Sequence, residues 1–556
     1  MQSIGQFFIK NSAVLTLSLK EVFCAILLFT MQLLPKFSFP SILTFLSTFC
    51  LSLLCTTSVF GQSTTPYFTY TLGFKNPESN VYEVTLETGN WDKDTIQFKM
   101  PRWMPGYYQY MQYPTDVRDF KVTDSKGKEL HVTQPKEHIW EVYGTKNKTL
   151  KLSYAVQTSK QFVANSFVDK EHAYIIPENS FMYVDHYVEL PVSVKIELKG
   201  SNWKDIATGL AQQNSKANYK AVDFDFLYDC PILIGNLKAL PEFKVQGLSH
   251  KFIGYKMGNF DGQQLMNDLE KMIIAASDLI GDIPYNEYTF LGIGPGRGGI
   301  EHLNSSAVSF NGEKLYDGRG YIGMLNFLAH EYFHHYNVKR IRPFELGPFD
   351  YENGSKTSQL WISEGLTSYY DNLLVRRAGL STDEDVYATI SRGITSYENN
   401  PGKHHQSLVD SSYETWHDGP FGKSGADPNK SISYYVKGPI VGLLLDFAIR
   451  HKTANQKSLD DVMRFMYYDY YKGKERGFTD AEFRLACETV AGASLQPLFE
   501  YVYTTAPLDY DTYLSYGGLQ LQKQQDSEGK DVYSLTPIGK PTKKQKAILE
   551  AWLGNK

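Results

Sequence analysis

Two histidines and a glutamate in the segment from His330 to His334 have the residue types and the spacing of a metal-dependent hydrolase. Residues four positions apart lie on one face of a helix, so His330 and His334 can both reach a single cation. A catalytic zinc is held by three protein ligands and keeps a fourth position open, and Glu331 is placed to take a proton from a water bound there. The sequence therefore predicts a zinc site with His330 and His334 as ligands and Glu331 as general base.

The flanking residues indicate that this motif lies on a half-buried helix, expected over residues 321–338, and they supply a third ligand. Apolar side chains recur around the motif at helical spacing: Leu325, Leu328, Ala329, Tyr332, Phe333 and Tyr336. A second stretch of helical periodicity, from Leu360 to Leu373, contains Glu364, which completes a set of two histidines and a carboxylate. The alternative is a pair of hydrogen-bonded helix histidines beside a structural carboxylate.

The segments that must position this site change character along the chain. From about Thr65 to Phe243 apolar and polar residues mostly alternate, as in 150–156 and 192–198, and turn sequences separate the alternating runs. This pattern predicts an all-β region built as a sandwich. The aromatic segment Pro101–Tyr108 is interpreted as a β edge with bulky side chains, rather than as a loop that leans toward a substrate site.

The rest of the chain predicts a mixed part and then a helical part. Periodicity is mixed over residues 244–380 and helical beyond them, where Ser458 with Asp461 and Thr479 with Glu482 form capping-box pairs ahead of apolar runs. At 556 residues the chain is long enough for several domains. We expect a leader at 1–61, a β-sandwich domain at 62–243, a catalytic domain at 244–390, an α-helical domain at 391–516 and a C-terminal tail at 517–556.

The first 61 residues have the composition of an export signal. They are apolar and nearly free of charge, and residues 41–60 form a long hydrophobic run. Val59 and Gly61 place small residues at the −3 and −1 positions of a cut before Gln62. We therefore expect a secreted or periplasmic protein, with Met31 as an alternative start. The other interpretation is an uncleaved N-terminal anchor helix, the only case in which membrane contact is expected.

Composition narrows the possible partners. A formal net charge of -5 provides no basic surface, so nucleic acid is not expected as a partner. A hydrophobic fraction of 42% is ample for large cores. Behind the leader only Cys230 and Cys487 remain, and neither has metal-motif spacing. Both are expected to be buried free thiols.

Three blocks of the sequence resemble the glycyl aminopeptidase family of gluzincin metallopeptidases: His330–Pro343, which is highly specific, Leu346–Tyr351 and Leu360–Tyr370. The similarity extends over most of the chain behind the leader. It implies a thermolysin-like α+β catalytic domain after the β-sandwich, with the C-terminal α-helical domain closing the cleft. It also implies one zinc ion per chain and peptide substrates with a free N-terminus, whose first residue is small, such as Gly or Ala.

The same resemblance implies further site residues. The stretch Gly298–His302 is similar to an exopeptidase motif in which a carboxylate on an edge strand binds the substrate's α-amine, a role that Glu301 would fill. Gly298 and Gly299 would let the strand backbone approach the peptide closely. Tyr435, which matches a Tyr-x-Lys-Gly pattern, would donate a hydrogen bond to the tetrahedral oxyanion.

The sequence thus predicts an exported zinc-dependent aminopeptidase. The segment after Gly517 is shorter than the ~80–90 residues that a PDZ domain needs, so the PDZ domain of many relatives, and a partner bound through it, are not expected. Two alternatives remain. One is a zinc endopeptidase with the same site, in which Glu301 is only structural; the other is a non-catalytic binding protein that retains the fold.

Overall fold

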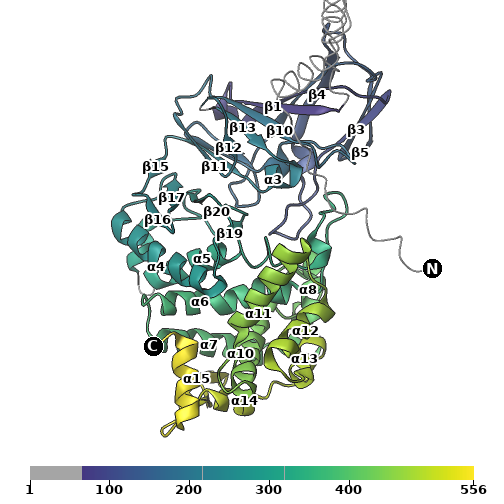
Figure 1. The fold of residues 1–556 in the computed structure, drawn as a ribbon. Helices are drawn as coiled ribbons and strands as arrows, with labels where there is room; N and C mark the ends of the chain where they lie inside the picture. Colours follow the sequence, from purple (N-terminus) through teal and green to yellow (C-terminus); the bar gives the residue numbers. More distant parts are fainter. Residues whose placement is uncertain (1–64, 216, 318–319, 556) are drawn as a thin grey trace, which may run out of the picture. The chain divides into compact units, whose positions relative to one another are not determined.

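The computed structural model describes residues 65–556 apart from 216, 318, 319 and 556, so the predicted leader lies outside the described residues. These residues belong to one compact unit, Thr65–Lys556. A β-rich N-terminal domain comes first, drawn in purple to blue in Figure 1, and a helical C-terminal region comes last, in green to yellow. A β-rich part followed by a helical part is the order that the sequence predicted. The boundaries at 243, 390 and 516 stay predictions.

In the described chain, the N-terminal domain contains sheets of seven, four and three strands. The seven-stranded sheet runs in the order β12 (Ala211–Gln212), β13 (Asn218–Ala221), β10 (Val192–Glu197), β1 (Tyr67–Gly73), β2 (Val81–Gly89), β7 (Leu150–Gln157) and β4 (Val117–Asp124). The four-stranded sheet is β11 (Asp205–Thr208), β14 (Ile232–Gly235), β9 (His172–Ile175) and β8 (Phe167–Val168). The three-stranded sheet is β3 (Thr95–Lys99), β6 (Ile139–Tyr143) and β5 (Val132–Lys136), and the short helix α3 spans Phe224–Tyr228.

The predicted alternation is what forms the core of this domain. Strand β1 buries every second residue, Phe68, Tyr70 and Leu72, because successive side chains of a strand point to opposite faces. Strand β7 alternates in the same way. Cys230 is buried in this core and Cys487 in the helical region, and both thiols are free, as predicted.

A mixed sheet follows and places a short edge strand beside the metal-motif helix. Strands β17 (Leu248–Gly254), β18 (Glu287–Gly292) and β20 (Ser305–Val308) are parallel, and β19 (Gly299–Glu301) pairs antiparallel with β20. Strands β15 (Lys238–Ala239) and β16 (Phe243–Val245) both pair with β17. Helix α4 (Gly262–Ile280) contacts β16, and helix α5 (Gly320–Phe333) contacts β19 and β20.

The helical region is organised around α10 (Tyr434–Lys452), which contacts most of the other helices of this region. This helix is long and apolar enough to cross a membrane, but 83% of its most apolar window is buried inside the protein, as in the core helix of a folded domain. Both predicted capping boxes are present, at the starts of α11 and α12. The other helices are α6 (Thr367–Arg377), α7 (Asp383–Glu398), α8 (Leu408–Tyr413), α9 (Thr415–Asp418), α11 (Leu459–Phe465), α12 (Asp480–Ala491), α13 (Gln496–Tyr503), α14 (Tyr510–Tyr516) and α15 (Lys543–Leu553).

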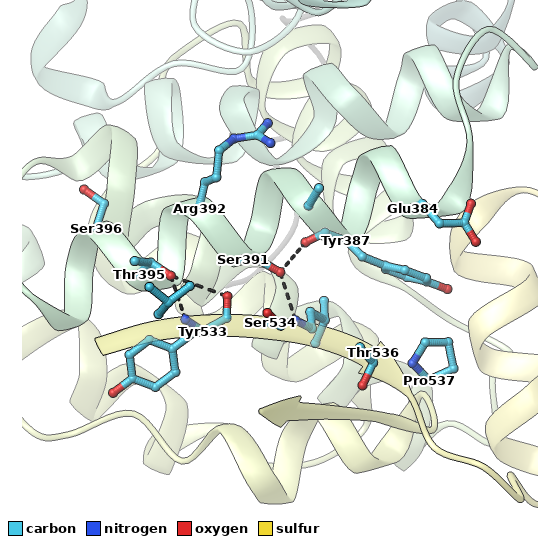
Figure 2. A pocket seen from close by; sticks show the side chains of 13 residues that line it. Glu384, Tyr387, Ser391, Arg392, Thr395, Ser396, Tyr533, Ser534, Thr536 and Pro537 are labelled. Carbon is cyan, nitrogen blue, oxygen red and sulfur yellow. Dashed lines mark hydrogen bonds between the residues drawn. The ribbon is translucent and has the colours of Figure 1, made fainter. Parts of the chain in front are cut away.

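The segment expected to be a tail is packed against this region. It forms a hairpin, β21 (Leu519–Gln525) and β22 (Asp531–Pro537), followed by α15. Hydroxyl groups of α7 bond to the strand edge: the Leu535 N–H donates to Ser391 Oγ (2.9 Å) and the Tyr533 N–H to Thr395 Oγ1 (2.9 Å) (Figure 2). These side chains satisfy backbone groups that an edge strand otherwise exposes. The hollow between α7 and β22 contains none of the predicted site residues.

Candidate active site

His330 and Glu331 lie in the last turn of α5, and His334 directly follows the helix. The prediction extended this helix to 338, but α5 ends at Phe333. The His334 N–H still donates to His330 O (3.2 Å), so one helical turn separates the two histidines as expected. Beyond that point the backbone departs from the α-helical pattern, and the Lys339 N–H reaches back to His334 O (3.0 Å).

Glu364 lies in a π-helical turn, Trp361–Leu366, that leads into α6. Such turns often occur at functional sites. This turn packs directly on the backbone of α10, because a Cβ atom on Gly365 would lie only 2.8 Å from Gly438 Cα. Two glycines therefore allow the closest possible approach of the two segments, and this contact fixes Glu364 against the start of α10.

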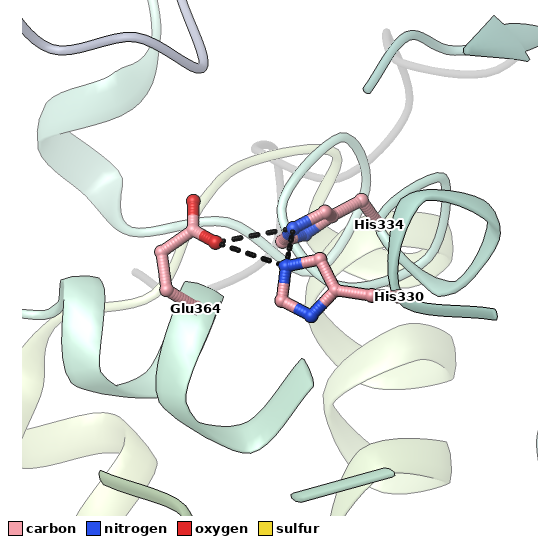
Figure 3. Close-up of side chains that lie close together, drawn as sticks. All are labelled: His330, His334 and Glu364. Atoms are coloured by element: carbon pink, nitrogen blue, oxygen red, sulfur yellow. Dashed lines mark hydrogen bonds and ion pairs between the residues drawn. The ribbon is translucent and has the colours of Figure 1, made fainter. Parts of the chain in front are cut away.

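The three predicted ligands point toward one another (Figure 3). The Nε2 atoms of His330 and His334 are 3.0 Å apart. Glu364 Oε2 lies 3.1 Å from His334 Nε2 and 3.5 Å from His330 Nε2. His334 and Glu364 are each only 1% exposed, so these polar atoms face one another away from water.

This geometry fits a tetrahedral metal ion. Ligands held at about 2.0–2.1 Å from such an ion lie roughly 3.3–3.4 Å apart, close to the observed spacings. Two imidazoles and one carboxylate are a donor set that zinc accepts, and they leave a fourth position for water or substrate. Within the described chain, this is the group of His, Cys, Asp and Glu residues whose ligand atoms converge in this way.

Two residues outside the predicted set orient the ligands. His334 Nδ1 donates to Asn337 O (2.9 Å), and Asp371 Oδ2 lies 3.4 Å from His330 Nδ1. Because a carbonyl oxygen can only accept, His334 carries its proton on Nδ1, which leaves the Nε2 lone pair facing the cluster. The Asn337 side chain also donates to Ile362 O (2.8 Å) and so connects the motif to the turn that carries Glu364.

The charges around the cluster favour a cation. Burial acts to lower the pKa of His330, but Asp371 and Glu364 raise it to about 10. Burial acts to raise the pKa of Glu364, yet His334 and His330 hold it below its ordinary value. Positive charge is thus stabilised where the three ligands meet, whether a proton or a metal ion provides it.

The short strand β19 carries Glu301 as its last residue and contacts the Glu331 side chain at its first. A Cβ on Gly299 would lie 2.5 Å from the Glu331 carboxyl group, so this carboxyl rests on the bare backbone of the strand. Glu301 is two residues further on and therefore points to the same face. Gly298 has a positive φ of 88°, which turns the chain into β19. Burial raises the pKa of Glu331 to about 7, although His330 and His334 act to lower it.

Glu301 is buried without a hydrogen bond to one of its oxygens. It is 3% exposed, and its Oε1 atom has no partner among the described residues. A buried carboxylate oxygen without a donor is costly, so this atom has the environment of a binding group for an external donor. Glu301 also lies within electrostatic reach of Glu331 and His334.

The segment at Pro101–Tyr108 is not the β edge that was predicted. It belongs to a loop between β3 and the next helical turn, and it extends to the site. A Cβ on Gly106 would lie 2.9 Å from Glu301 Oε2, so the loop backbone covers the carboxylate. Alternation alone could not show this, because the contact joins positions far apart in sequence. The positive φ of Gly106, 96°, is the local feature that permits it.

Tyr435 is the tyrosine of its pair that faces the metal cluster. Its ring centroid lies 6.1 Å from that of His330, whereas the Tyr434 hydroxyl is already paired with Thr415 Oγ1 (3.0 Å). Burial and Glu364 raise the pKa of Tyr435 well above its ordinary value, which keeps the hydroxyl protonated as a donor. His335, by contrast, is a fully buried structural residue among tyrosines, and burial holds its pKa well below the ordinary value.

Comparison with known proteins identifies the class and then the family. The model of the Peptidase M61 N-terminal domain matches residues 69–236, and the M61 glycyl aminopeptidase model matches residues 323–441. Together they span more than half of the chain and contain the metal motif, which makes this protein a zinc metallopeptidase. The chain belongs to the M61 glycyl aminopeptidase family, as the sequence predicted. No curated protein matches the chain.

Solved structures share the fold. An aminopeptidase N family protein from Idiomarina loihiensis has a TM-score of 0.77 and 24% identity, with 86% of this chain and 82% of that chain covered. A mutant M1 zinc metallopeptidase from Deinococcus radiodurans, bound to a Tyr-Ser-Ala substrate, has a TM-score of 0.50 and 14% identity, with 80% and 94% covered. At these identities the likeness describes the fold alone.

The contact between Gly299 and Glu331 gives a prediction. Replacing Gly299 with Ala places a methyl group where the Glu331 carboxyl lies, so the carboxyl must move. A displacement of about 1 Å in a reacting group can cost roughly 100-fold in rate, and we expect kcat to fall by that order with zinc content unchanged. Gly323→Ala is the control, because a Cβ there meets nothing within 4 Å. Normal kcat in Gly299→Ala would contradict this account.

Proposed function

We propose that this protein is an exported zinc aminopeptidase that removes small N-terminal residues from peptides. The observation that carries the proposal is the buried, unpartnered carboxylate oxygen of Glu301 on the same strand face as the general-base candidate Glu331. A free α-ammonium group supplies the hydrogen-bond donors and the positive charge that this oxygen lacks. The β-rich domain, a thermolysin-like catalytic part and the helical region would together form the enzyme.

Each residue of the site would have a defined task. Zinc, held by His330, His334 and Glu364, would act as a Lewis acid that polarises the scissile carbonyl and makes water a better nucleophile. Glu331 would take the proton of the attacking water and pass it to the leaving amine. A carboxylate with a pKa near 7 suits both halves of this transfer, because it can hold and release a proton near neutral pH.

Two other groups would stabilise charge that develops or enters during the reaction. Tyr435 would donate a hydrogen bond from its hydroxyl group to the oxyanion, since that hydroxyl stays protonated and its ring lies beside His330. Glu301 would hold the substrate's α-ammonium and so set the distance from the N-terminus to the cleaved bond. An enzyme with this restraint removes one residue at a time, whereas an endopeptidase would not need the amine.

Family membership supports the preference for small residues, because the matched model is that of glycyl aminopeptidases. The direct experiment is hydrolysis of a panel of aminoacyl chromogenic substrates, with Gly and Ala among them, before and after treatment with a chelator. We expect the activity to be greatest on small residues, to disappear with the chelator, and to return when zinc is added back.

The general-base role predicts a separation between activity and metal binding. Glu331→Gln keeps the shape of the side chain but cannot carry the proton, so we expect turnover to fall at least about 100-fold while zinc remains bound. Glu364→Ala is the contrasting variant, because it removes a ligand and should lose zinc. Elemental analysis of both proteins, alongside initial rates, checks the pair. Stoichiometric zinc in Glu364→Ala would point to another third ligand.

The amine-binding role predicts a dependence on the free N-terminus. Removing one partner of a buried charge pair costs about 2–5 kcal/mol, so Glu301→Ala should lose at least tenfold in kcat/KM on peptides with a free amine. The wild-type enzyme should leave N-acetylated versions of its best peptides uncut. A paired assay on free and acetylated peptides of one sequence is decisive. Equal cleavage of both by the wild type, unchanged in Glu301→Ala, would support the endopeptidase alternative.

Export predicts the N-terminus of the mature protein. The leader ends in small residues at Val59 and Gly61, so cleavage should leave Gln62 as the first residue. Intact-mass measurement of protein recovered from the periplasm or the medium checks this. A mature chain that still contains residues 41–60 would favour the membrane-anchored alternative.

A further inference from the structure

The loop at residues 101–112 reaches from the β-rich domain to the active site and carries a buried tyrosine, Tyr108. Two of its residues have left-handed backbone conformations: Gly106, with φ 96°, and Tyr108, with φ 52°. Glycine adopts this conformation freely, but a bulky residue does so only where its surroundings hold it there. The left-handed conformation of Tyr108 therefore indicates that contacts of the surrounding loop hold this residue in place.

Anchors on both sides of Tyr108 hold the loop to other parts of the chain. Trp103 Nε1 donates to Asp350 O (2.6 Å), and the Tyr110 hydroxyl donates to Asn353 O. Trp103 also packs edge to face on Trp416, with ring centroids 5.0 Å apart. The side chain of Tyr108 stacks on that of Trp103. The loop is thus a rigid part of the site wall.

The loop contacts Glu301 at one end and Thr415, which is paired with the neighbour of Tyr435, at the other. Gly106 lies against the Glu301 carboxylate. Three residues later, Gln109 Nε2 donates to Thr415 O (2.5 Å), and the Thr415 hydroxyl is paired with Tyr434. Tyr108 lies between these two contacts. Along the chain, Tyr108 is two residues from the contact with Glu301 and one residue from the contact with Thr415.

The side chain of Tyr108 faces the site, and the β-rich core does not contain it. It is 3% exposed and packs in the same apolar cluster as α5 and the π-helical turn. Burial raises its pKa well above the ordinary value, and the negative charges of Glu301 and Glu364 act in the same direction. Among the described residues, no side chain or backbone group forms a hydrogen bond with this hydroxyl.

We propose that the ring of Tyr108 limits the size of the substrate's N-terminal side chain. The inference rests on the proposed function: a substrate whose amine is on Glu301 and whose carbonyl is at the metal cluster must place its first side chain between these groups. Tyr108 lies two residues from the contact with Glu301, on an anchored loop, and its ring is buried in the apolar cluster that lines the site. A hydrogen atom or a methyl group fits beside a fixed aromatic ring more easily than a branched side chain, so glycine and alanine are selected by exclusion.

The test compares Gly and Leu p-nitroanilides on the zinc-loaded enzyme. One extra methylene group in a restrictive pocket already changes kcat/KM by roughly 10–200-fold. Tyr108→Gly removes the ring and suits the positive φ, so the preference for Gly over Leu should fall at least about tenfold. Tyr108→Phe keeps the ring and should keep the preference. Gln112→Ala, a change on the same loop at an exposed residue, is the matched control and should also keep it.

Each outcome is informative. An unchanged Gly-to-Leu ratio in zinc-replete Tyr108→Gly overturns the proposal, as does a relaxed ratio in Tyr108→Phe, which would assign selection to the hydroxyl. If Tyr108→Gly does not fold, Tyr108→Asn serves instead, because Asn tolerates this backbone conformation. A wild type that cleaves neither substrate would contradict the proposed function itself, whereas a wild type that prefers Gly, with a ratio unaffected by Tyr108, contradicts only this inference.

Discussion

The burial of negative charge is the constraint on which the active site depends. Glu301, Glu331 and Glu364 are 3%, 5% and 1% exposed, and all three lie around two histidines. Isolated buried carboxylates are expensive, so such a group persists only where positive charge compensates it. In the proposed function, a metal ion at the ligand cluster and an ammonium group at Glu301 would provide two compensating charges. The electrostatics that make these buried carboxylates costly on their own therefore favour the binding of cations at this site.

Glycine residues, which have no side chain, allow these carboxylates to lie close together. Gly299 lets the Glu331 carboxyl rest on strand β19, and Gly106 lets a loop from the β-rich domain cover Glu301. Gly365 and Gly438 let the Glu364 turn touch the backbone of α10, which also carries Tyr435. In each case the groups of the site are positioned by contact with backbone, which moves far less than a side chain does. Rigid placement of this kind lets an electrostatic site act without reorganising.

The sequence was sufficient for the parts of the site that follow from local spacing. The i, i+4 histidines and Glu364 come together as the spacing predicted. Resemblance to a family indicated Glu301 and Tyr435, and their roles stay predictions. The helix end at Phe333 was missed, because an interaction of Asn337 with His334 interrupts a pattern whose apolar residues continue. Asp371 could have been found, since it follows Glu364 by seven positions and so lies on the same helical face. The contribution of residues 101–112 to the site could not be predicted from the sequence, because it depends on contacts with positions hundreds of residues away.

That long separation has a consequence for how the protein acquires its site. The bond from Gln109 to Thr415 joins residues 306 positions apart, and Gly106 meets Glu301 across nearly 200 positions. Contacts of such high order form late in folding, after the entropy of closing a very large loop has been overcome. The contacts of residues 101–112 with the site are therefore expected to form after the local helices and strands that they join. A fragment limited to the metal-binding segment would therefore lack the part of the site that residues 101–112 contribute.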